Sequence, residues 1–67
     1  MATSAFTVTG MTCDHCVRSV TEEVGEVRGV SEVRVDLGTG VVEVSGDQPL
    51  DDAAIRAAIE EAGYTVV

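Results

Sequence analysis

Two cysteines, Cys13 and Cys16, stand three residues apart and flank the only histidine of the chain, His15. They close the stretch 10–16, which lies between an alternating apolar segment and a helical pattern. Residues three apart on a first helical turn have Cβ atoms about 5–6 Å apart, so both thiols can reach one metal ion. Unpaired N–H groups at a helix start favour negative charge and lower a thiol pKa. The stretch therefore predicts a pair of metal-binding thiolates.

Other interpretations of the pair stay open at the level of the residues. Cysteine often packs as a small apolar residue, and two close thiols can also form a redox dithiol. A disulfide closing so short a loop constrains the unfolded chain little, and in a reducing compartment a close pair is typical of metal-binding or catalytic sites. A small dithiol oxidoreductase is therefore the rival from another functional class.

The choice of metal depends on how many ligands the loop offers. Zn(II) in a stable protein site takes four ligands, and Asp14 keeps this alternative open because a carboxylate suits a harder ion. However, Asp14 and His15 lie between the two cysteines, and so short a bridge can hardly fold both side chains back onto the same ion. Cu(I) is soft and is satisfied by two thiolates. The predicted ion is Cu(I), with Zn(II) bound more weakly.

The elements that position the loop follow from the spacing of apolar residues. Alternation over 5–9, with Phe6 and Val8 on one face, predicts a strand. Valines at intervals of three and four from Val17 to Val27 predict a helix that ends near residue 25 or 26. Thr12 is its predicted cap, with a start one or two residues later as the alternative.

The rest of the chain is read from the same patterns of apolar residues and glycines. Alternation and turn-forming glycines predict two further strands over 31–36 and 41–45, a helix over 50–62 and a short strand over 64–67. The order strand, helix, strand, strand, helix, strand is that of the α+β, ferredoxin-like βαββαβ fold: a four-stranded antiparallel sheet with both helices on one face. With 67 residues and no linker or repeat, residues 1–67 are expected to form a single domain.

Charge and composition exclude several functional classes. Twelve acidic residues against four basic ones give a net charge of −8, which disfavours nucleic acid and anionic membrane surfaces as partners. No segment approaches the roughly 18 apolar residues that span a bilayer, and the N-terminus lacks the pattern of a signal peptide. We expect a cytoplasmic location. No nucleophile–base arrangement or phosphate-binding glycine loop is present, so we expect no enzymatic activity.

The sequence Gly-Met-Thr-Cys-Asp-His-Cys resembles the metal-binding loop of the heavy-metal-associated domain family. The resemblance continues through 29–30, 33–37 and 62–64 and covers essentially the whole chain. It implies a Cu(I) chaperone similar to the stand-alone bacterial carriers of the CopZ type, with Cys13 and Cys16 as ligands. The implied partner is a copper-transporting P-type ATPase with its own Cys-x-x-Cys domain. The implied handover exchanges one cysteine at a time through shared thiolates.

The resemblance also assigns supporting roles around the two ligands. Met11 is expected to pack beneath the loop, and Tyr64 to shield the metal from water. Thr12, Asp14 and His15 complete the surroundings, with Asp14 solvated and His15 either exposed, a tuner of thiolate acidity or a third ligand.

The oligomeric state and the wider context are further expectations. The strong negative charge predicts a monomer without copper, and two loops sharing copper through four thiolates could form a bridged dimer. The alternative functions are a metal-binding domain of such an ATPase and a Zn(II) or Hg(II) carrier of the same fold. A start at Met1 and an end just after the last predicted strand favour a free-standing carrier.

Overall fold

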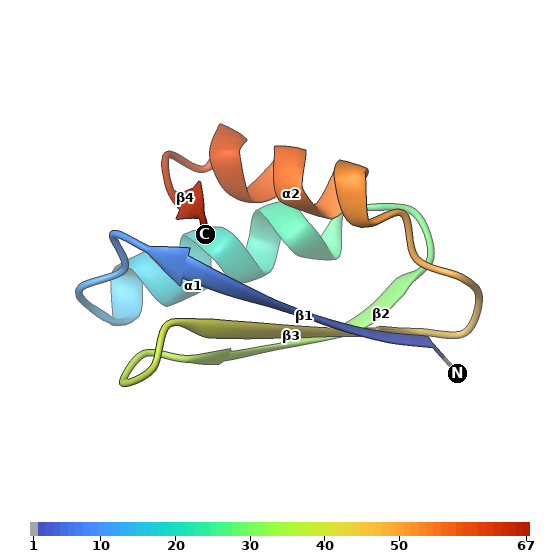
Figure 1. Cartoon of the computed structure of the whole chain (residues 1–67), viewed down its shortest axis with the longest axis horizontal. Coiled ribbons are helices and arrows are strands. Elements are labelled where there is room, and N and C mark those ends of the chain that lie inside the picture. The colour runs from blue at the N-terminus through green and yellow to red at the C-terminus, as the bar shows by residue number, and fades with distance from the viewer. Residues whose placement is uncertain (1) are drawn as a thin grey trace.

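A four-stranded sheet with two helices on one of its faces makes up the computed structural model, which describes residues 2–67 (Figure 1). The sheet order is β2-β3-β1-β4, and every neighbouring pair is antiparallel. The predicted ferredoxin-like fold is confirmed. The elements are β1 (Ala2–Thr9), α1 (Asp14–Gly25), β2 (Val30–Asp36), β3 (Val41–Gly46), α2 (Asp52–Glu61) and β4 (Thr65–Val66).

The core lies between the sheet and the helices, where the two sequence periodicities meet. Alternate residues of β1 and β3 direct apolar side chains into the space between the sheet and the helices. Residues four apart on each helix do the same, so these side chains form one layer. No polar or charged side chain of residues 2–67 is buried with them. The buried set is Phe6, Val8, Val20, Val24, Val42, Val44, Ile55 and Ile59.

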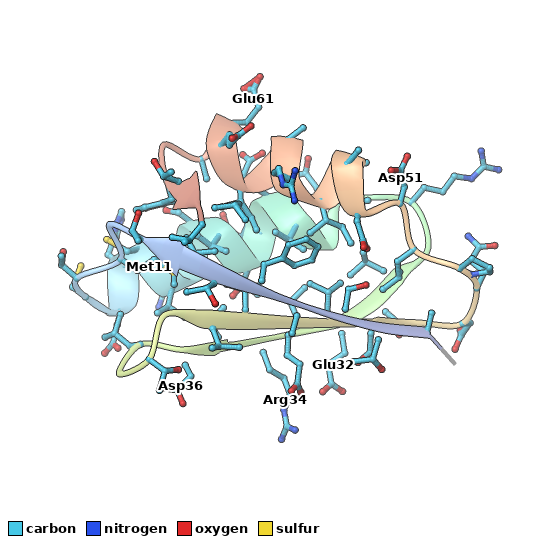
Figure 2. The ribbon with its side chains drawn as sticks, in the orientation of Figure 1. Met11, Glu32, Arg34, Asp36, Asp51 and Glu61 are labelled. Atoms are coloured by element: carbon cyan, nitrogen blue, oxygen red, sulfur yellow. The ribbon has the colours of Figure 1, made fainter. Side chains whose placement is uncertain are left out.

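The opposite face of the sheet is open and polar. Glu32 and Arg34 of β2 point away from the helices (Figure 2), and Arg34 Nε lies 3.5 Å from Glu32 Oε1. Both side chains are exposed, so this ion pair contributes little to stability. Charges on an edge strand also discourage pairing with another chain.

The element boundaries that matter most here differ from the sequence prediction at β1, α2 and β4. β1 begins at Ala2 instead of residue 5, because Ala2 to Thr7 pair in continuous register with β3. α2 begins at Asp52, and Asp51 is its N-cap, with its side chain accepting a hydrogen bond from the Ala54 N–H at 3.2 Å. β4 is only two residues long, so Tyr64 precedes the strand.

The turn between β2 and β3 is fastened to the end of β1. Gly40 has φ +78°, and its carbonyl accepts a hydrogen bond from the Val8 N–H at 2.8 Å. An added Cβ on Gly40 would lie 2.6 Å from the Val8 carbonyl oxygen. Only glycine tolerates both the backbone conformation and the close approach. The turn thereby holds the strand end from which the cysteine loop departs.

Candidate metal centre

The cysteine loop connects the end of β1 to the start of α1, at the same end of the molecule as the β2–β3 turn and β4 (Figure 1). Gly10 has φ +97°, the left-handed conformation that lets the chain leave the strand. An added Cβ at Gly10 would lie 3.3 Å from Cδ1 of Tyr64, so the tyrosine ring covers this turn. Tyr64 is half-buried and packs against the core.

Cys13 and Cys16 are brought together by the first turn of α1. Cys13 is the N-cap residue in an extended conformation, and its carbonyl accepts hydrogen bonds from the N–H groups of Cys16 at 3.0 Å and Val17 at 3.2 Å. The two Sγ atoms lie 3.6 Å apart, and neither is in a disulfide. Cys13 is exposed and Cys16 is half-buried. Two free sulfurs therefore meet at the surface.

Thr12 is not the helix cap. The helix begins later, with Cys13 as N-cap, and the side chain of that cap accepts no hydrogen bond from the helix. The Thr12 hydroxyl instead lies 3.9 Å from Cys16 Sγ. The sequence indicated Thr12 as the cap because a threonine hydroxyl can accept a hydrogen bond from a backbone N–H group of the first helical turn. Its i, i+4 spacing to Cys16 was the signal that could have indicated this contact.

The thiol of Cys16 is poised to ionise. Its pKa is lowered from 9.0 to about 6, chiefly by a hydrogen bond from the Thr12 backbone, then by the Tyr64 hydroxyl and by Cys13. The Thr12 hydroxyl adds to this effect, and partial burial opposes it. The hydrogen bond with Cys16 in turn raises the pKa of Tyr64. The sequence predicted that the helix start lowers a thiol pKa, and the pKa of Cys16 is indeed lowered. The largest cause, however, is the hydrogen bond from the backbone of the loop residue Thr12 rather than the helix.

The other predicted site residues in the loop and at the start of α1 differ in burial. Met11, a residue of the loop itself, is half-buried and packs against the core (Figure 2). Asp14 is the first residue of α1, and both Asp14 and His15 are exposed. Within residues 2–67, no three side chains of the types His, Cys, Asp or Glu converge in a way that could hold a metal ion. The arrangement thus offers two sulfur donors and open solvent.

Comparison with known proteins gives a consistent result. Residues 5–65 match the heavy-metal-associated domain. The chain is 45% identical to the copper chaperone CopZ of Bacillus subtilis, over 98% of this chain and 97% of that protein. It is also 46% identical, over 90% of its length, to a probable copper-exporting P-type ATPase of Archaeoglobus fulgidus, of which it spans only 8%.

Solved structures show the same fold around the loop. A structure described as a CopZ metallochaperone superposes with a TM-score of 0.93 at 33% identity, over 98% of this chain and 100% of that one. None of the helices in residues 2–67 is both long and apolar enough to cross a membrane. The paired cysteines at the start of α1, the ferredoxin-like fold and the match over residues 5–65 place this chain in the heavy-metal-associated domain family.

Proposed function

We propose that this chain is a cytoplasmic copper chaperone that holds one Cu(I) ion between Cys13 and Cys16. The observation that carries the proposal is the pair of free Sγ atoms, 3.6 Å apart at the surface. The similarity to CopZ of Bacillus subtilis over nearly the full length of both chains supports the assignment.

The donor set favours Cu(I) over Zn(II). Zn(II) in stable sites is bound by four ligands, whereas in residues 2–67 no three His, Cys, Asp or Glu side chains converge, and the two thiols form a close pair. Cu(I) is soft and prefers thiolate sulfur. The lowered pKa of Cys16 supplies one thiolate at neutral pH without help from the metal. The alternative functions are a Zn(II) carrier and an Hg(II) carrier of the same fold. Competition of these metals with Cu(I) for the reduced chain excludes or supports them.

The open side of the site suits transfer. Cys13 is exposed, so a thiolate of a partner can approach the ion before Cys13 or Cys16 departs. The proposed partner is a metal-binding domain of a copper-transporting P-type ATPase, since such ATPases are among the relatives of this chain. The same similarity supports the second candidate function, in which this chain is itself such a domain.

Substitution of each cysteine tests the ligand assignment. Cys13→Ser and Cys16→Ser should each abolish tight Cu(I) binding, measured by competition with a Cu(I) chelator. Neither thiol belongs to the buried core, so circular dichroism should show an intact fold in both variants. Full Cu(I) affinity in both single variants would refute the assignment.

X-ray absorption of the one-to-one complex tests the metal. We expect sulfur-only scattering at low coordination number, and Zn(II) that Cu(I) readily displaces. A tetrahedral site with nitrogen or oxygen ligands, retaining Zn(II) against Cu(I), would contradict the copper assignment.

Assembly follows from the same exposed thiols. The net charge of −8 keeps the chain monomeric without metal, and above one copper per chain two loops share ions through four thiolates. The exposed His15 could reach such a cluster from either molecule. Sedimentation at increasing Cu(I) loading tests this, and a strict monomer beyond one copper per chain counts against sharing.

A further inference from the structure

β2 lies at one edge of the sheet, so one side of this strand has no neighbouring strand within residues 2–67. The hydrogen bond from the Val8 N–H to the Gly40 carbonyl fixes which residues of β1 bond toward β3, and the pairing registers extend this alternation to β2. The backbone of Arg34 therefore bonds toward β3, while the N–H and C=O groups of Val33 and Val35 point to the free edge. Among the described residues, no backbone group pairs with them there.

The side chains along this edge alternate between an apolar and a charged face. Val33 and Val35 are half-buried and pack against the core on the helix side. Glu32 and Arg34 lie on the open face, with 63% and 74% of their side chains exposed (Figure 2). Their mutual contact is an exposed ion pair, which is weak, so both charges are free to turn toward another strand.

An antiparallel strand centred opposite Val33 would meet both charges at once. Val33 would exchange two backbone hydrogen bonds with the residue opposite it. Glu32 and Arg34, one residue to either side, would then form non-hydrogen-bonded pairs, whose Cα atoms lie about 4.5 Å apart and whose side chains are close. Opposite charges in such pairs stabilise a sheet, and like charges destabilise it. A matching strand therefore carries a basic residue opposite Glu32 and an acidic residue opposite Arg34.

We propose that the free edge of β2 docks an extended strand of a positively charged partner protein, in which an acidic residue is followed two positions later by a basic one. Backbone hydrogen bonds to Val33 and Val35 would add this strand to the sheet. Charges on an edge strand oppose pairing with unmatched strands, and the same charges select the matching pattern. The net charge of −8 favours a basic partner over a second copy, because two such chains repel each other.

This docking edge is separate from the cysteine loop. The loop leaves the end of β1, and β3 lies between β1 and β2 in the sheet. The strand nearest Tyr64, β4, is at the opposite edge. A strand added beside β2 therefore extends the sheet away from the two thiols, and its binding does not depend on the metal.

NMR titration of the full chain, reduced and metal-free, tests the edge with two peptides of equal composition. The first has the sequence of residues 30–36, which contains the acid–base pattern, followed by lysines that make it positively charged. In the second, the glutamate and the arginine exchange places. The first peptide should shift the amide signals of Val33 and Val35 and slow their hydrogen exchange. The second should bind roughly tenfold more weakly, because both pairs then join like charges.

The double variant Glu32→Arg/Arg34→Glu is the matched control, because it reverses the charge pattern and keeps the net charge of −8. It should prefer the second peptide by a similar factor. Absence of amide shifts at millimolar peptide would overturn the proposal. Equal binding of both peptides would also overturn it, because unspecific attraction to an acidic chain gives that result. Dimerisation of the metal-free chain through the same amides would identify a second copy as the occupant and overturn the choice of a basic partner.

Discussion

Replacement of Gly40 by alanine should destabilise the whole chain through two separate costs. Its φ of +78° lies in the left-handed region, where a side chain costs about 1–2 kcal/mol. The added Cβ would also lie 2.6 Å from the Val8 carbonyl oxygen, and relieving such overpacking costs about 1–3 kcal/mol. The sum is about 2–5 kcal/mol.

This cost is large for a chain of this size. At 0.05–0.15 kcal/mol per residue, 67 residues give a free energy of unfolding of roughly 3–10 kcal/mol. Because 1 kcal/mol shifts the Tm of a small domain by about 4–8 °C, Gly40→Ala should lower the Tm by roughly 8 °C or more. Thermal and urea unfolding of the reduced, metal-free chain, followed by circular dichroism, measure this change.

Gly38→Ala in the same turn is the matched control. Gly38 is not among the glycines with positive φ, and its added Cβ would lie 3.4 Å from Asp36 Oδ1, an ordinary contact. We expect its free energy of unfolding to stay within about 0.5 kcal/mol of the unaltered chain. If Gly40→Ala behaves like Gly38→Ala, the claim that this turn holds the end of β1 through a close backbone approach is wrong.

Three further predictions concern the thiol, a helix end and a helix cap. Because the folded pKa of Cys16, about 6, lies below its unfolded value of 9.0, its contribution to stability is fully present above pH 9 and is lost as pH falls through about 6. Tyr64→Phe removes one hydrogen-bond donor to Cys16, so it should raise the pKa of Cys16 and weaken the dependence of stability on pH. Urea unfolding and alkylation rates measured against pH will show both effects. An unchanged alkylation profile would exclude the tyrosine as a donor. Gly25→Ala should stabilise the chain by about 0.5–1 kcal/mol in urea unfolding, because the added Cβ meets nothing within 4 Å in the last turn of α1; a loss of stability would contradict this. Asp51→Ala should cost about 1 kcal/mol in the same assay, and Asp51→Asn should retain most of the stability, because asparagine can still accept from the Ala54 N–H.

Local periodicity was sufficient to predict the core. Val20 and Val24 on α1, and Ile55 and Ile59 on α2, are four residues apart and fully buried. The alternation of Val42 and Val44 likewise gave the inward face of β3. These positions were predictable because the burial of a face depends on the period of the apolar residues, which the sequence displays directly.

The parts that were missed depend on contacts between distant residues. The first residues of β1, Ala2 to Ser4, have little apolar alternation and are strand because they pair with β3. Tyr64 was expected near the loop only through the family resemblance, since 54 residues separate it from Gly10. The contribution of the Thr12 backbone to the pKa of Cys16 depends on the path of the loop. Such features follow from tertiary geometry rather than from residue type.

The shortness of β4 has a consequence for motion at the metal site. This strand is held to β1 by the pairs Val8 with Val66 and Thr9 with Thr65, while β1 and β3 pair over six positions. Segments with few partners open locally without global unfolding, and their amide hydrogens exchange first. Tyr64 directly precedes this strand, and Val67, which follows it, donates its N–H to the Thr7 carbonyl at 2.8 Å. Local opening of the C-terminus would therefore lift the tyrosine from the sulfurs while the β1–β3 ladder stays closed.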